Sequence, residues 1–206
     1  MGEERGGGRP GRPTPAERRE QRAASEDPAG VLDTAARFLE ARPRSEAEVR
    51  EKLIRLGYRP ALVDDAVARL LAVGYLDDAA FARAWVGSRD RARPRGEQAL
   101  RRELGQRGVD RALVDEVLGE RRDEAAGHAD DGSGSADPDA AAAERLLARR
   151  IGPILRESDP RRRLQRAYAL LARNGFAPDV CSAVARRALA GTAAWPGPGP
   201  DPGTDG

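Results

Sequence analysis

Residues 57–67 read GYRPALVDDAV and residues 108–118 read GVDRALVDEVL, so the tetrapeptide ALVD occurs twice, each time four residues after a glycine. A third, more divergent copy of this pattern surrounds Gly175. A leucine stands four residues before each glycine, and an apolar residue stands directly after it. The residues of this frame are Leu53, Gly57, Tyr58, Leu104, Gly108, Val109, Leu171, Gly175 and Phe176. Three copies with the same offsets indicate an internal repeat, so we interpret these residues as structural anchors.

The offsets within each copy are those of a helix end followed at once by a helix start. A glycine in the left-handed conformation commonly ends a helix, and in the resulting Schellman motif the residue four before the glycine contacts the residue after it. The next helix then begins at Pro60, Arg111 or Pro178, and proline suits a first helical position because its missing N–H is not needed there. In the second copy Asp110 is the expected N-cap. The pattern predicts two helices joined by a short glycine turn in every repeat.

Composition extends this pattern to the whole fold. Aromatic residues make up 4% of the chain and β-branched residues form no alternating run, so the composition favours an all-α protein. Each period has room for a further helix before the glycine-joined pair. We therefore expect three tandem three-helix repeats that stack into an elongated, curved, right-handed-type helical array. The expected boundaries are a disordered tail at 1–28, repeats at 29–74, 75–119 and 139–191, a disordered acidic linker at 120–138 and a disordered tail at 192–206.

Adjacent carboxylates at Asp77 and Asp78 invite a metal-site or hydrolase hypothesis. No histidine, further acid cluster or Gly-rich phosphate loop lies near them in the sequence, so we expect neither metal binding nor catalysis there. Both stand at a predicted helix start, where a carboxylate accepts free N–H groups and faces the positive end of the helix dipole. A capping role is likewise expected for Asp110 and for Ser45, whose sequence SEAE has the spacing of a capping box.

Several classes of protein are disfavoured by what the chain lacks. One cysteine, Cys181, and one histidine, His128, cannot supply a disulfide, a zinc site or a Cys/His pair placed by spacing. No stretch resembles a secretory signal, and none approaches the ~18 continuous apolar residues of a membrane span. We expect a cytoplasmic protein with no cofactor, no small-molecule substrate and no membrane association.

The formal net charge is only +2, but it is unevenly distributed along the chain. Residues 89–107 carry a net charge of +4 and residues 144–173 carry +6, whereas residues 119–139 carry −5. Basic helical segments are candidates for binding phosphate or an acidic protein surface, and solvated helix faces with internal ion pairs are the alternative. The planar guanidinium of arginine suits carboxylates and phosphates alike. The candidate contact residues are Arg89, Arg91, Arg93, Arg95, Arg101, Arg102, Arg161, Arg162, Arg163 and Arg166.

Two helices joined by a short glycine turn also describe the helix-turn-helix motif of DNA-reading proteins. A recognition helix presents basic and amide side chains at its N-terminal end to the DNA groove. Two of the corresponding helices here begin PALVDDAV and RALVDEVL, with carboxylates where phosphates would lie. We therefore do not expect these helices to read a DNA sequence. No aromatic residue interrupts either arginine run, which also disfavours a reader that stacks on bases.

Three longer motifs carry a resemblance to a known family. They are SEAEVREKLIRLGY (45–58), GYLDDAAFARAWVGSR (74–89) and RGEQALRRELGQRGV (95–109). In this order and spacing they resemble motifs of the RecX family of bacterial recombinase regulators. The resemblance covers residues 31–119 strongly and the third repeat more weakly.

The resemblance implies a regulator and not an enzyme. It implies a protein that binds the filament of RecA recombinase on single-stranded DNA and inhibits the ATPase, strand-exchange and coprotease activities of RecA. Its processes would then be homologous recombination and the SOS response of DNA repair. Direct DNA binding would be weak, and the alternative is a sequence-tolerant DNA-binding helical repeat that acts without RecA.

Overall fold

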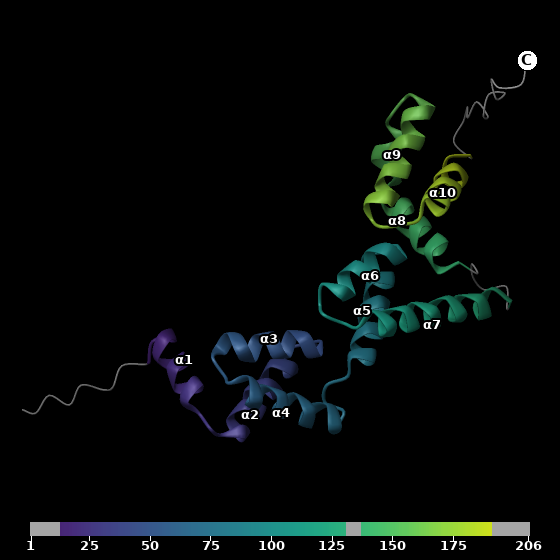
Figure 1. Cartoon of the computed structure of the whole chain (residues 1–206). Coiled ribbons are helices and arrows are strands. Elements are labelled where there is room, and N and C mark those ends of the chain that lie inside the picture. The colour runs from purple at the N-terminus through teal and green to yellow at the C-terminus, as the bar shows by residue number, and fades with distance from the viewer. Residues whose placement is uncertain (1–12, 131–136, 191–206) are drawn as a thin grey trace, which may run out of the picture. The chain divides into compact units, whose positions relative to one another are not determined.

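The computed structural model describes residues 13–130 and 137–190, and every regular element in these ranges is a helix (Figure 1). The helices are α1 (Pro15–Ala24), α2 (Pro28–Glu40), α3 (Glu46–Leu56), α4 (Pro60–Ala72), α5 (Asp78–Ala92), α6 (Glu97–Gly105), α7 (Arg111–Asp130), α8 (Pro138–Leu155), α9 (Pro160–Arg173) and α10 (Pro178–Ala190). The prediction of an all-α protein is confirmed. The chain divides into two compact units, residues 1–78 and 79–206.

The first unit holds one group of three helices, α2 to α4, around its own core. Val31 from α2, Val49 and Leu53 from α3, and Val63 and Val67 from α4 are almost completely buried there. The two residues from α3, and likewise the two from α4, lie four positions apart, which places each pair on one face of its helix. Burying that shared face is what stabilises helices of this length in water.

The second unit holds two further groups of three helices, each with its own core. Phe81, Leu100 and Leu118 represent the core of α5, α6 and α7, and Leu147 and Leu171 represent that of α8, α9 and α10. The helix order thus follows the predicted three-helix repeats. The boundaries of the repeats and the curved array remain predictions.

All three glycine turns have the backbone of a Schellman motif. The φ angles of Gly57, Gly108 and Gly175 are 102°, 75° and 82°, in the left-handed region that favours glycine. The residue after each glycine donates its N–H to the carbonyl of the leucine that stands four residues before that glycine. The N···O distances are 3.3 Å in the first copy, 3.2 Å in the second and 3.4 Å in the third. These bonds satisfy carbonyls that a helix end leaves free.

The expected disorder of residues 1–28 is wrong for the segment that forms α1. Thr14 accepts from the Glu17 N–H at 3.2 Å, and the Glu17 carboxylate accepts from the Thr14 N–H at 2.7 Å. This is a capping box, completed by Pro15 at the first helical position. The sequence TPAE has the same capping-box spacing as SEAE at the start of α3. Residues 1–12 lie outside the described ranges.

The expected disordered linker at 120–138 is also partly wrong, because α7 continues through its first half. Arg121 has a side chain that is only 8% exposed and lies among carboxylates of two other helices. It donates to Asp90 of α5 at 2.9 Å and to Asp139 of α8 at 2.7 Å. The same guanidinium reaches the Pro138 carbonyl at 3.3 Å. These bonds fix both ends of the segment that the sequence suggested was free.

The aspartates at the starts of α5 and α8 play matching roles at the repeat junctions. Asp78 accepts from the Glu46 N–H, the first residue of α3, at 2.7 Å. Asp139 accepts from the Glu97 N–H, the first residue of α6, at 2.9 Å. Each carboxylate therefore satisfies a free N–H of the second helix in the preceding repeat. For Asp78 this differs from the predicted capping of its own helix; no role was predicted for Asp139.

Candidate functional site

The candidate arginines fall into several groups, and the first, near α5 and α6, takes part in the fold. Arg89 donates to Glu103 at 2.6 Å, and the Nε of Arg95 lies 3.3 Å from the same carboxylate. The Arg89 guanidinium also lies 4.2 Å from the ring centre of Trp85, whose indole N–H donates to Glu103 at 3.0 Å. Arg95 further donates to the side chain of Asn174, which precedes the third glycine turn. These cations therefore hold α5, α6 and the α9 end together.

Arg101 is held in the same way, and the internal repeat shows why. It donates to Glu97 within α6 and to Asp115 of α7 at 3.0 Å. The equivalent position in the first repeat, seven residues before its glycine, is Arg50, which donates to Glu46 and Asp64. An arrangement present in two repeats is a packing device of the repeat. Its acidic partners occupy the guanidinium groups that a ligand would need.

The second group has exposed side chains that make no ion pair or side-chain hydrogen bond within the described ranges. Its members are Arg91, Arg93, Arg102 and Arg161. Arg162 is almost as free, because its side chain is 71% exposed and its Nε lies 3.6 Å from Asp159. An exposed pair of this kind stabilises the fold by less than ~1 kcal/mol, so a ligand can displace it readily.

Arg163 and Arg166 both turn toward the loop before α9. Arg163 donates to the carbonyl of Glu157, and Arg166 lies 3.1 Å from the carboxylate of the same residue. Arg163 is half-buried, whereas the side chain of Arg166 is exposed. Of the predicted third-repeat arginines, Arg166 alone lines a concave surface.

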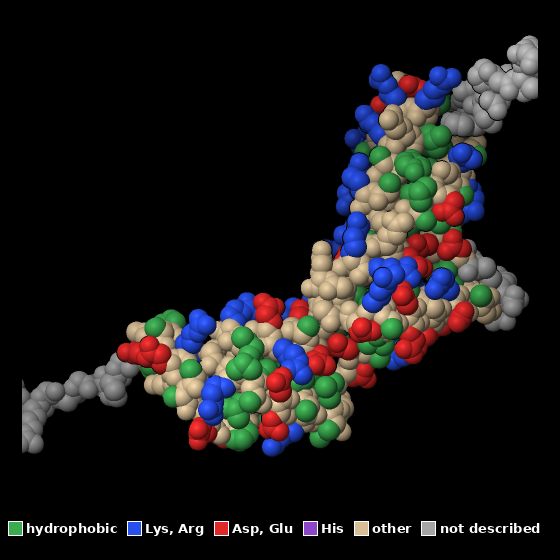
Figure 2. Space-filling model, in the orientation of Figure 1, with side chains coloured by type: hydrophobic (Ala, Val, Ile, Leu, Met, Phe, Trp, Pro, Cys, Tyr) green, Lys and Arg blue, Asp and Glu red, His purple; other side chains and the backbone are tan. Residues whose placement is uncertain are grey.

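That surface is a groove of about 450 Å³ between α8 and α9, here called the α8–α9 groove. Its lining residues are Arg150, Pro153, Ile154, Gln165, Arg166, Ala169, Leu170 and Arg173. The lining contains three guanidinium groups and no carboxylate. Figure 2 shows Lys and Arg side chains following α9, with hydrophobic side chains beside them and acidic side chains gathered over α7. The groove thus combines an apolar floor with a positively charged rim.

Sequence reasoning missed Arg150 and Arg173, which make no ion pair among the residues that the structure describes. A helical signal for one of them was present in the sequence RAYALLAR. Arg166 and Arg173 lie seven residues apart in α9 and flank Leu170, so the three share a helix face. Arg150 comes from α8, and no local pattern links it to this face.

The groups that suggested metal or nucleophilic chemistry have structural roles. Burial raises the pKa of the Asp78 carboxyl; the bond from the Glu46 N–H opposes this rise, whereas the nearby charges of Glu46 and Asp77 add to it. Cys181 is buried, its Sγ lies 3.5 Å from the Phe176 carbonyl, and burial raises its pKa. A thiol with a raised pKa is a poor nucleophile at neutral pH. Across residues 13–130 and 137–190, no three His, Cys, Asp or Glu side chains gather as a metal site would require, and no helix has the length and apolarity to cross a membrane.

Comparisons with known proteins agree with this repeat architecture. A family model described as "RecX, first three-helix domain" matches residues 32–70, and one described as "RecX, second three-helix domain" matches residues 77–118. The regulatory protein RecX of Chlorobium phaeobacteroides (strain BS1) is 33% identical over 153 residues, which are 74% of this chain and 89% of that protein. The chain belongs to the RecX family. A regulatory role follows from this membership.

Further RecX proteins support the assignment. The regulatory protein RecX of Deinococcus radiodurans is 36% identical over 166 residues, or 81% of this chain and 69% of that protein. The crystal structure of RecX from Lactobacillus salivarius has a TM-score of 0.65 at 16% identity and covers 79% of this chain and 96% of that one. A second RecX crystal structure has a TM-score of 0.62 at 19% identity. Both structures share the helical fold. The α8–α9 groove lies beyond the two matched RecX domains, in the third repeat.

Proposed function

We propose that this RecX chain binds the filament of RecA on single-stranded DNA and inhibits the ATPase, strand-exchange and coprotease activities of RecA. The protein would act in the cytoplasm, where it would regulate homologous recombination and SOS repair. The observation that carries the proposal is the α8–α9 groove, together with membership of a family of regulatory proteins. A filament presents both phosphates and protein carboxylates, and guanidinium groups bind either ligand.

The contact surface that we propose is smaller than the arginine content suggests. It comprises the groove arginines Arg150, Arg166 and Arg173 and the exposed Arg161 and Arg162 on α9. Arg91, Arg93 and Arg102 form the corresponding exposed set near α6. Arg166 is included although it lies 3.1 Å from Glu157, because its exposed side chain lines the groove. Arg89, Arg95 and Arg101 are left out because carboxylates of the fold bind them and they do not line this groove.

We propose that the chain acts by binding and not by catalysis. Asp78, one of the two adjacent acids that drew attention in the sequence, accepts a backbone N–H of the protein itself. The apolar floor of the groove offers Ile154 and Leu170 but no aromatic ring. Such a floor suits the apolar side chains of a protein better than stacked bases. A RecA filament therefore agrees with the groove better than naked DNA does.

The test is inhibition of the ATPase of RecA on single-stranded DNA by substoichiometric amounts of the chain. The variant Arg150→Gln/Arg166→Gln/Arg173→Gln is expected to need at least about tenfold more protein for half-maximal inhibition. One lost charge-assisted hydrogen bond of about 1.5 kcal/mol already accounts for a factor of ten.

The matched control is Arg111→Gln/Arg122→Gln/Arg187→Gln, which removes the same charge from arginines that lie beside carboxylates in the same unit. It is expected to inhibit as the unmodified chain does. Equal inhibition by all three proteins would contradict the role of the groove. If the chain binds naked DNA as tightly as preformed filaments at physiological salt and leaves the ATPase unchanged, the alternative that it acts without RecA would replace the proposal.

A further inference from the structure

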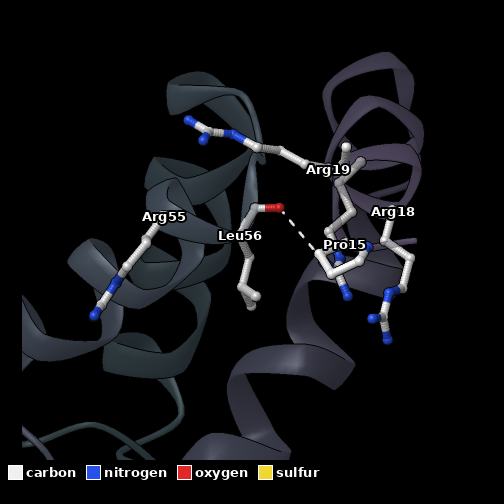
Figure 3. Close-up of a pocket in the computed structure, with 7 residues that line it drawn as sticks. Pro15, Arg18, Arg19, Arg55 and Leu56 are labelled. Carbon is white, nitrogen blue, oxygen red and sulfur yellow. Dashed lines mark hydrogen bonds between the residues drawn. The ribbon is translucent and has the colours of Figure 1, made fainter. Parts of the chain in front are cut away.

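Helix α1 precedes the residues that match the first RecX domain and forms, with the end of α3, a second arginine-lined hollow. The hollow has a volume of about 570 Å³ and is lined by Pro15, Ala16, Arg18, Arg19, Arg22, Arg55 and Leu56. Four of these residues are arginines, and none is acidic. In Figure 3, Arg18 and Arg19 project from α1, and Arg55 projects from α3 on the other side of Leu56.

The position of α1 against the end of α3 depends on the first repeat glycine. A Cβ at Gly57 would lie 2.6 Å from Cγ of Arg19 and 2.8 Å from its carbonyl oxygen, so only glycine admits α1 this closely. Arg22 donates to the Leu56 carbonyl at 3.5 Å and lies 5.8 Å from the ring centre of Tyr58. Glycine at position 57 thus serves both the turn and the docking of α1.

The arginines of the hollow are available to a ligand. Arg18 and Arg19 make no ion pair within the described part of the chain, and the pair of Arg55 with Glu51 is exposed and 3.5 Å long. The nearest acid in sequence, Glu17, is held in the capping box of α1 and does not line the hollow. A ligand would therefore displace little more than water and one weak ion pair.

The chemistry of the hollow selects phosphate over a protein partner. A protein interface of useful affinity needs large apolar or aromatic anchors in a desolvated pocket, whereas Leu56 is the one large apolar side chain here. Arg18 and Arg19 from α1 and Arg55 from α3 place three separate cations around the hollow, which suits a chain of repeated anions. No ring is present on which a base could stack, so contact would be with the sugar-phosphate backbone.

We propose that Arg18, Arg19 and Arg55 form a backbone-binding site for single-stranded DNA, separate from the arginine surface of the second unit. This inference rests on the proposed function, because the ligand of the site would be the single-stranded DNA of the RecA filament. A chain that contacts the filament through one site in each unit gains affinity because the second contact forms at a high effective concentration.

The test is binding of a labelled oligo-dT to the full chain, measured by fluorescence anisotropy as a function of salt. In Arg18→Gln/Arg19→Gln/Arg55→Gln, glutamine keeps the Cγ that packs against Gly57 and removes only the charge. For single strands each lost phosphate contact lowers the slope of log K against log salt by about 0.7, so the slope is expected to fall by about 2. The control Arg37→Gln/Arg42→Gln/Arg69→Gln removes three arginines of the same unit that lie beside carboxylates, and its slope is expected to stay unchanged.

This assay contains no RecA, so its outcome is independent of the ATPase result. A reduced slope in the hollow variant alone supports the site even if RecA is unaffected by the chain. An unchanged slope overturns it, and loss of RecA inhibition with an unchanged slope would assign the hollow to a protein contact instead. Absence of oligo-dT binding by the unmodified chain would also overturn the proposal.

Discussion

Helices α6 and α9 hold the same place in successive repeats, yet they use charge in opposite ways. Counted back from their glycines, Glu97 of α6 corresponds to Leu164 of α9, and Glu103 corresponds to Leu170. In α6 these carboxylates bind arginines of the second repeat. In α9 the apolar replacements leave neighbouring arginines facing a groove. The groove arginines Arg166 and Arg173 also stand where α6 has Ala99 and Gln106. Relative to α6, α9 has therefore lost two acids and gained two arginines at these positions, and this combination gives a surface that can bind an anion.

The largest loss of stability is expected at Arg121, the arginine that links α7 to α8. Its partner Asp139 both binds this arginine and accepts the N–H of the first residue of α6. Arg121→Met leaves the largely buried Asp139 without its cation and, in the described part of the chain, leaves Asp90 with only Arg145, at 3.8 Å. The expected loss in the free energy of unfolding is about 3 kcal/mol, measured by urea denaturation followed by circular dichroism. Arg122→Met removes an exposed neighbour and is expected to change stability by less than about 0.5 kcal/mol. Similar values for both variants would contradict a structural role for the network.

A smaller loss of stability is expected when an arginine with partly exposed ion pairs is replaced, and its comparison with an unpaired arginine tests the difference between the two groups. Arg101→Gln is expected to lower the free energy of unfolding by up to about 1 kcal/mol, because its ion pairs are partly exposed. Arg173→Gln removes an arginine with no such pair in the described structure and is expected to leave stability within about 0.5 kcal/mol. Thermal and urea unfolding of the two variants measure this difference. A larger loss for Arg173→Gln would show that the groove rim stabilises the fold.

The smallest effect concerns Asp78, the counterpart of Asp139 in the first unit. Its folded-state pKa is raised above the ordinary 3.8, so the folded chain binds this proton more tightly than the unfolded chain does. The contribution of the site is therefore greatest below the ordinary pKa and is lost as the pH rises through the folded-state pKa. Asp78→Asn keeps an oxygen for the Glu46 N–H and removes the titration.

The measurement is the difference in the free energy of unfolding between the unmodified chain and Asp78→Asn, taken from pH 3 to pH 7. The unmodified chain is expected to lose stability relative to the variant as the pH rises through the folded-state pKa of Asp78, because burial raises that pKa. A difference that grows in the opposite direction would show that the N–H bond and not burial controls this carboxyl.

The sequence predicted those parts of the fold that depend on residues close together in the chain. Leucine, glycine and an apolar residue at fixed offsets predicted the three turns, because a Schellman motif is a local structure. The capping box of α1 was equally local but lay in a segment whose composition resembled a disordered tail. The composition of a segment averages over all its residues, so it does not reveal a capping box that depends on only two of them, Thr14 and Glu17.

The candidate site was less predictable because the partner of an arginine lies elsewhere in the chain. Arg89 and Arg102 look alike in the sequence, but one lies against Glu103 and Trp85 while the other is exposed. Arg150 and Arg166 come together only when α8 packs on α9. Charge density located the basic segments, whereas separating structural arginines from available ones required the tertiary fold.

The hydrogen bond from the Glu46 N–H to the Asp78 carboxylate determines where the first repeat can be cut from the rest of the chain. The repeat period alone suggests ending the first repeat at residue 74, yet the carboxylate that completes the start of α3 lies four residues further on. A fragment cut at the period would begin α3 with one more unbonded N–H, whereas a fragment that includes Asp78 would keep it bonded. Each of the first two repeats thus depends on an aspartate at the start of the repeat that follows it, and an excised copy of either repeat has to include that aspartate.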